Sequence, residues 1–83
     1  MMYQAKIEVG LKLGHSDPEG EMTAQSLKEL EYLVKSVSVS KVYEVYFEAS
    51  SMEEAEKQVD EMCRRLLANP TKDDYKFEIE EAE

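Results

Sequence analysis

Residues that form covalent or metal cross-links are scarce in this 83-residue chain, which has one cysteine, Cys63, and one histidine, His15. One cysteine cannot close a disulfide within the chain, and one cysteine with one histidine cannot complete a tetrahedral structural metal site. Domains of this size bury only a modest fraction of the surface that their unfolded chain exposes. With disulfides and metals excluded, association with another chain remains as the source of extra stability. The free thiol suits a reducing cytoplasm.

Positive charge is also in short supply, because 10 basic side chains face 19 acidic ones and give a formal charge of -9. Such a chain repels phosphate backbones and anionic lipid headgroups, which argues against nucleic-acid and membrane binding. The sequence lacks an apolar run long enough to span a bilayer, and it lacks a charged leader followed by an apolar segment. We therefore expect a cytoplasmic protein.

The first two elements are a strand and a helix. Apolar side chains occupy the odd positions of residues 3–13, a period of two that predicts a strand with one buried face. Asp17 can cap a helix that follows, and Pro18 suits its first position because the missing N–H would be unpaired there. Leu27, Leu30 and Val34 then form the apolar stripe of this helix.

The middle of the chain, residues 36–50, keeps the odd apolar phase with one interruption at Lys41. This pattern predicts either one long, bent strand or two short strands that meet near Ser40 and Lys41, and periodicity leaves both open. Lys41 itself is either a turn residue at that junction or a contact for a partner or a ligand anion, because a buried lysine without a counter-charge is costly. Val42 and Tyr46 place apolar groups on the opposite face as well, which suggests a partner that covers it.

A second helix and a last strand complete the chain. Ser51 begins a capping-box pattern with Glu54, and Asn69 followed by Pro70 ends the helix, because the residue before proline is disfavoured in the helical region. Residues 75–80 alternate again and predict a strand. The order predicts a single α+β domain over residues 1–83, with a small, mostly antiparallel sheet of three long strands, the middle one whole or split in two, and two helices on one face.

The sequence offers little that could act as an enzyme. It contains no glycine-rich phosphate loop, no metal-ligand spacing and no nucleophile motif, so we expect no cofactor, no metal and no catalytic residue. His15 lies in a polar turn and is expected to be exposed, and Cys63 lies among apolar helix positions and is expected to pack in the core. Arg64 and Arg65 point about 100° apart on a helix, which suits a solvated face better than a phosphate site.

Three segments resemble the PurS family, the small subunits of phosphoribosylformylglycinamidine synthase. They are Asp17-Pro18-Glu19-Gly20 at the first helix, Ser40-Lys41-Val42-Tyr43 in the middle strand, and the stretch from Met62 to Pro70 that contains Leu-Leu-Ala-Asn-Pro and is followed by Asp74-Tyr75. They occur in the family's order and spacing. The positions that match its motifs, expected to face a partner or form turns, are Asp17, Pro18, Gly20, Lys41, Asn69, Pro70 and Tyr75.

The resemblance implies a homodimer with joined sheets, and it leaves open whether two dimers associate further. It also implies a non-catalytic subunit that bridges a glutaminase subunit and a large ATP-dependent synthetase subunit and supports ammonia transfer between them. The complex would convert formylglycinamide ribonucleotide, ATP and glutamine to formylglycinamidine ribonucleotide, ADP, phosphate and glutamate. The main alternative is a stand-alone α+β homodimer that binds a regulatory metabolite. A small phosphate-ester hydrolase ranks third, because it would need basic and nucleophilic residues that converge on one site, and the sequence offers no such pair.

Overall fold

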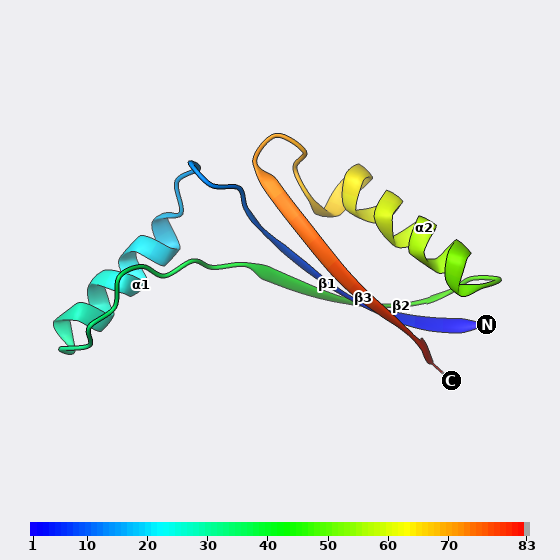
Figure 1. Ribbon diagram of the computed structural model, residues 1–83, viewed down its shortest axis with the longest axis horizontal. Helices are drawn as coiled ribbons and strands as arrows, with labels where there is room; N and C mark the ends of the chain where they lie inside the picture. Colours follow the sequence, from blue (N-terminus) through cyan, green and yellow to red (C-terminus); the bar gives the residue numbers. More distant parts are fainter. Residues whose placement is uncertain (83) are drawn as a thin grey trace.

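The computed structural model describes residues 1–82, and Figure 1 shows the arrangement of its elements. Three strands, two α-helices and one π-helical turn follow in the order β1 (Met2–Leu11), α1 (Pro18–Glu29), β2 (Lys41–Glu48), α2 (Met52–Met62), η1 (Cys63–Leu67) and β3 (Asp73–Ala82). No helix within these residues is long and apolar enough to cross a membrane.

The three strands that the alternating sequence predicts form one antiparallel sheet, and their order in it is β2-β1-β3. Ile7 in the central strand lies opposite Tyr43 in β2 and Phe77 in β3. Because side chains alternate between the faces of a sheet, this register places the odd residues of all three strands on the same face. The predicted α+β class with a small antiparallel sheet is confirmed.

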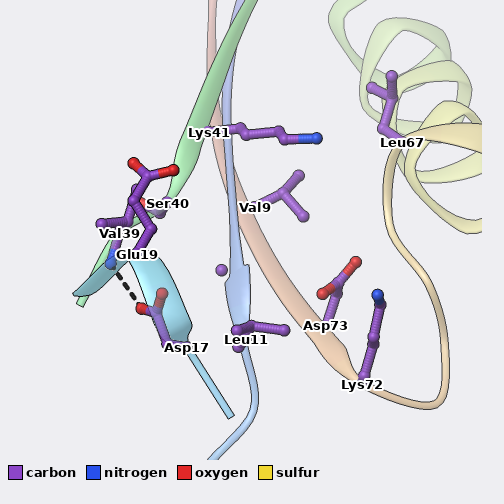
Figure 2. A pocket seen from close by; sticks show the side chains of 11 residues that line it. Val9, Leu11, Asp17, Glu19, Val39, Ser40, Lys41, Leu67, Lys72 and Asp73 are labelled. Atoms are coloured by element: carbon purple, nitrogen blue, oxygen red, sulfur yellow. Dashed lines mark hydrogen bonds between the residues drawn. The ribbon is translucent and has the colours of Figure 1, made fainter. Parts of the chain in front are cut away.

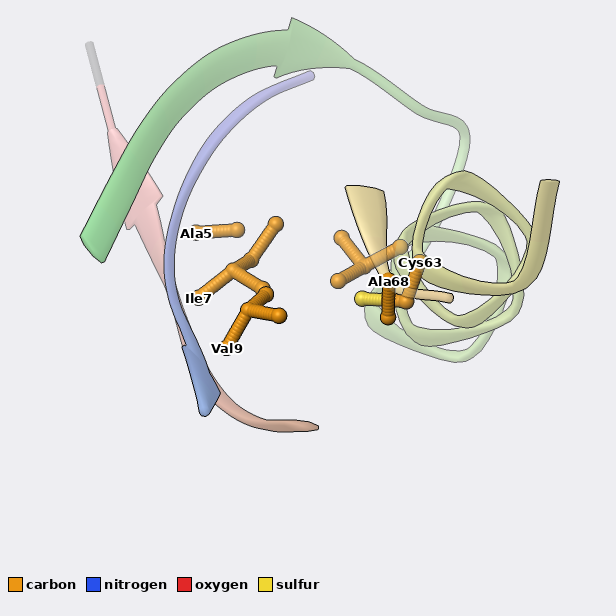
Figure 3. Close-up of a cluster of buried hydrophobic side chains, with 6 residues drawn as sticks. Ala5, Ile7, Val9, Cys63 and Ala68 are labelled. Carbon is orange, nitrogen blue, oxygen red and sulfur yellow. The ribbon is translucent and has the colours of Figure 1, made fainter. Parts of the chain in front are cut away.

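Helix α2 covers the odd face and closes the core (Figure 3). Ile7 from β1 and Val59 and Cys63 from the helical side are completely buried. The Ser51 hydroxyl caps α2 by accepting the Glu54 N–H at 3.1 Å. At the other end, η1 finishes with a bond of 2.9 Å from the Ala68 N–H to the Cys63 carbonyl. The core is therefore built from β1, the neighbouring strands and one helix.

Helix α1 differs from the prediction that both helices lie on one face of the sheet. Within one chain only α2 packs there, and α1 lies beyond the end of the sheet (Figure 1). The chain is accordingly extended, with a radius of gyration of 16.3 Å, whereas a compact domain of this length has about 12 Å. We call residues 17–40, which comprise α1 and the segment that returns from it, the arm.

The middle strand is shorter than predicted. Strand β2 begins at Lys41, and residues 34–40 lead into it without belonging to a strand. The physical reason is the lack of a neighbour, because β1 ends at Leu11 and pairs with β2 only as far as Val9 opposite Lys41. Of the backbone N–H groups from residue 34 to residue 40, only that of Val39 finds a partner within residues 1–82.

Over residues 1–82 no helix covers the even face of the sheet, because α2 lies on the face of Ala5, Ile7 and Val9. Val42 and Tyr46 lie on it and are exposed, Val42 by 49%. Around them the face is charged, and Lys76 pairs with Glu8 at 3.4 Å. The sequence correctly indicated a second face with apolar groups that one chain leaves uncovered.

Candidate interaction site

The Asp17 carboxylate fastens the arm together at its base. Its Oδ1 accepts the Gly20 N–H at 2.9 Å and so caps α1, and its Oδ2 accepts the Val39 N–H at 2.9 Å. One side chain thus joins the start of the helix to the returning segment. The hydrogen bonds from Gly20 and Val39 hold the pKa of the Asp17 carboxyl below its usual range, because they stabilise the ionised form.

Pro18 and Gly20 complete this clamp. Pro18 occupies the first turn of α1, where its missing N–H leaves nothing unpaired. Gly20 is buried, and a Cβ built there would lie 2.3 Å from the Val37 carbonyl oxygen. Only glycine allows the helix to approach the returning segment so closely. The motif that opens the helix therefore fixes the shape of the arm, and a contact of these residues with a partner stays a prediction.

Lys41 lines a cavity of about 260 Å³ where the arm joins the sheet. Figure 2 shows its side chain reaching across the cavity above Val9, while Lys72, in the turn before β3, and Asp73, the first residue of β3, point into it. Lys41 is exposed at the first position of β2, so it breaks the apolar phase where the core ends. Within residues 1–82 it makes no ion pair.

The cavity carries both signs of charge, because Asp17, Glu19 and Asp73 line it together with Lys41 and Lys72. Such a lining suits neither a bare anion nor a bare cation, but it can form ion pairs with a polypeptide partner. No group of three or more His, Cys, Asp or Glu side chains within residues 1–82 is arranged to hold a metal ion.

Asn69 and Pro70 build the turn that enters β3. The Asn69 side-chain oxygen accepts the Thr71 N–H at 2.9 Å, and the Asn69 N–H donates to Asp73 Oδ2 at 2.8 Å. Lys12 ties this turn to the end of β1, because its ammonium donates to the Pro70 carbonyl at 3.2 Å. Asn69 and Pro70 are thus turn-forming residues, and their contact with a partner is untested.

Tyr75 links β3 to α2. Its hydroxyl donates to Asp60 Oδ1 at 2.6 Å, while Asp60 Oδ2 accepts from Arg64 Nε at 2.8 Å. The Tyr75 bond lowers the pKa of the Asp60 carboxyl and raises the pKa of the Tyr75 phenol. The sequence analysis missed Asp60, although its position four residues before Arg64 is typical of a helical ion pair.

The seven motif positions thus fall into separate groups rather than one catalytic cluster. Asp17 and Lys41 share the cavity at the base of the arm, whereas Tyr75 belongs to the contact between α2 and β3. His15 is exposed in its turn. Cys63 is buried as predicted, and burial raises the pKa of its thiol, which keeps the sulfur protonated. Among residues 1–82, the seven motif positions do not place a nucleophile beside a base.

Comparison with known proteins identifies the family. The model of the PurS family, phosphoribosylformylglycinamidine (FGAM) synthase, matches residues 4–81. The phosphoribosylformylglycinamidine synthase subunit PurS of Archaeoglobus fulgidus is 47% identical over 72 residues, which are 86% of this chain and 90% of that protein. The subunit of the same name from Bacillus subtilis is 37% identical over 96% of this chain and 95% of its own.

Solved structures agree with these matches. Thermus thermophilus PurS superposes with a TM-score of 0.89 at 38% identity and covers 100% of both chains. A chain from the structure of PurLQS from Thermotoga maritima gives a TM-score of 0.84 at 29% identity over 99% of both chains. The resemblance seen in the sequence is confirmed, and the chain belongs to the PurS family of FGAM synthase.

Proposed function

We propose that this chain is the small, non-catalytic subunit of a cytoplasmic FGAM synthase complex, where it bridges the glutaminase and synthetase subunits and supports ammonia transfer. Membership of the PurS family makes it a subunit of FGAM synthase in purine biosynthesis. The bridging role is supported by the T. maritima chain, which is similar over almost its whole length and comes from a structure described as PurLQS.

The observation that carries the assembly role is the large apolar surface that one chain leaves in water. Leu30 and Leu33 on the arm are exposed by 68% and 103%, and Val42 is exposed on the open face of the sheet. Soluble proteins that act alone seldom leave such groups uncovered on several faces. A chain shaped in this way gains stability from partners, which is the property that a bridging subunit needs.

The same surface supports a homodimer as the unit that enters the complex. The arm extends far from the core, and its helix approaches its own returning segment closely at Gly20. A second copy offers an equivalent surface to cover it, and closed two-fold assemblies are the commonest oligomers. We therefore propose that a homodimer forms first and then binds the two larger subunits.

Sedimentation velocity tests this proposal. The protein is run alone and then mixed with the glutaminase and synthetase subunits of the same organism, in the presence of ATP and glutamine analogues. We expect a dimer that enters a faster-sedimenting complex only when both subunits are present. A dimer that binds neither subunit would overturn the bridging role and favour the alternative of a metabolite-binding module. A control mixture without this chain shows whether the two large subunits associate by themselves.

A further inference from the structure

We infer that the outer edge of β3 and the Arg64 guanidinium beside it bind an extended segment of one of the two large subunits. The segment adds a strand to the sheet next to β3 and places a carboxylate side chain against Arg64. The inference rests on the bridging function proposed above, and it names the surface and the chemistry by which one partner is held. This edge lies on the far side of the sheet from β2.

The outer edge of β3 offers a row of backbone groups to a partner. The strand has ten residues, and within residues 1–82 no strand pairs with its outer side. In an antiparallel pair, alternate residues direct their N–H and C=O groups away from the neighbouring strand. Tyr75, Phe77 and Ile79 on β3 are only partly buried against the core. A further strand would pair the open backbone groups and cover the outer flanks of these side chains.

Two hydrogen bonds in series hold Arg64 on this side of the helix. The Tyr75 hydroxyl reaches from β3 to Asp60 Oδ1 at 2.6 Å, and Asp60 Oδ2 accepts from Arg64 Nε at 2.8 Å. Arg65, by contrast, lines a groove together with Val45 of β2. Tyr75 and Asp60 are therefore positioning residues, and Arg64 is the group that they present beside the edge of β3.

The open part of Arg64 suits a carboxylate. Its Nε is bound to Asp60, and among residues 1–82 its two terminal nitrogens have no hydrogen-bond acceptor. These nitrogens form the planar fork that can hold both oxygens of one carboxylate. The Arg64 side chain is 60% exposed, so a partner can reach it. The neighbouring Asp60 repels a doubly charged phosphate more strongly than a singly charged carboxylate, which favours the carboxylate.

The even face of β3 specifies the other side of the segment. Asp74, Glu78 and Glu80 are exposed on that face, and Lys76 is already paired with Glu8 at 3.4 Å. Because the side chains of an added strand alternate between the two faces, the segment should carry basic groups toward these acids. Toward α2 it should carry the carboxylate and apolar groups. A second copy of β3 brings the same excess of acid, so its charges fit this edge less well than those of a basic segment.

Hydrogen exchange followed by mass spectrometry tests the added strand. The homodimer is measured alone and in the complex with the glutaminase and synthetase subunits, in peptides that cover residues 73–82. We expect the outer amides of β3 to exchange quickly in the homodimer and to be protected in the complex. The amides of β1 are the control, because β1 is paired on both sides and should not change.

The outcomes separate this inference from the bridging function. A complex that forms without new protection in β3 overturns the added strand, although the bridging function stands. Protection that grows with the concentration of this chain alone places a second copy at the edge and overturns it as well. Failure of the parent chain to join any complex overturns both.

The dissociation constant of the homodimer from the large subunits tests the contact of Arg64. Arg64→Ala should weaken binding at least about tenfold, and Arg64→Lys nearly as much, because an ammonium group lacks the fork. Tyr75→Phe should weaken binding about threefold in the parent and have no further effect in Arg64→Ala, because its effect runs through Arg64. A merely structural role of Tyr75 would persist in that second background and would contradict its positioning role.

Lys76→Ala is the matched control, because it removes one positive charge from the opposite face of β3. It should not weaken binding, since exposed ion pairs such as that of Lys76 with Glu8 contribute little. Sedimentation of each variant alone confirms that its homodimer is intact. Arg64→Ala binding as tight as the parent, or an equal loss in Lys76→Ala, would overturn the proposed contact.

Discussion

Replacing Gly20 by alanine tests how the arm is held together. Alanine is the better helix former and would by itself stabilise α1 by about 1 kcal/mol. The new Cβ, however, would lie 2.3 Å from the Val37 carbonyl oxygen and 2.7 Å from Asp17 Oδ2, whereas ordinary contact begins at 3.4 Å. Relief requires that the helix and the returning segment separate, because the nearest atom belongs to the backbone. Overpacking of this kind costs about 1 to 3 kcal/mol.

We therefore expect Gly20→Ala to lower the free energy of unfolding by about 2 kcal/mol, the upper steric cost less the gain in helix propensity. Urea denaturation followed by circular dichroism measures the change, at one fixed protein concentration because association contributes to stability. Faster amide exchange at Val39 would locate the damage in the clamp.

The control is Gly10→Ala, whose Cβ would meet Ser40 at an ordinary 3.5 Å. It should be neutral or stabilise by about 0.5 to 1 kcal/mol. A Gly20→Ala protein as stable as the parent would refute the reasoning, because it would show that α1 does not need the close approach to Val37.

Three further predictions concern the core and the contact between α2 and β3. Ile7→Ala should cost roughly 2 to 5 kcal/mol in urea denaturation, since Ile7 is completely buried at the centre of the sheet; a loss well under 1 kcal/mol would contradict this core. Tyr75→Phe should raise the pKa of Asp60 toward 3.8 in an NMR titration. In the parent protein the pKa of the Tyr75 phenol should lie above its usual 10.0. The hydrogen bond from Tyr75 to Asp60 therefore stabilises the fold fully below pH 10.0, and this contribution is lost as the pH rises through the raised pKa. An unshifted Tyr75 pKa would argue against the bond. The Cys63 thiol should react with an aromatic disulfide reagent only after urea is added, and rapid reaction of the native protein would exclude its burial.

The regular elements could be predicted because each has a local signal. The period of two in β1 and β3 reports a face that is buried in the chain's own core. Asp17 before Pro18 marks the start of α1, and Ser51 marks the start of α2, because capping is settled by side chains next to the helix. The burial of Cys63 followed from its place on the apolar stripe.

The long-range contacts of the motif residues could not be predicted, because they depend on groups far away in the sequence. Asp17 bonds Val39, which lies 22 residues later, and Gly20 is required by the Val37 carbonyl. Tyr75 bonds Asp60 across 15 residues, and nothing in the strand pattern names that acceptor. The motifs showed which residues to consider, whereas only the structure shows what each one holds in place.

The position of α1, which differs from the predicted one, shows what an apolar pattern can and cannot specify. The stripe on α1 indicates that a surface must be covered, but hydrophobic burial is non-directional and does not say which chain supplies the cover. In this chain, sterics and hydrogen bonds fix where α1 lies. The close contact at Gly20 and the hydrogen bonds of Asp17 hold α1 to a segment that leads directly into β2. The helix is thereby kept off its own sheet. Within residues 1–82 the packing of both helices on one face of the sheet, which the sequence predicted, is therefore not formed.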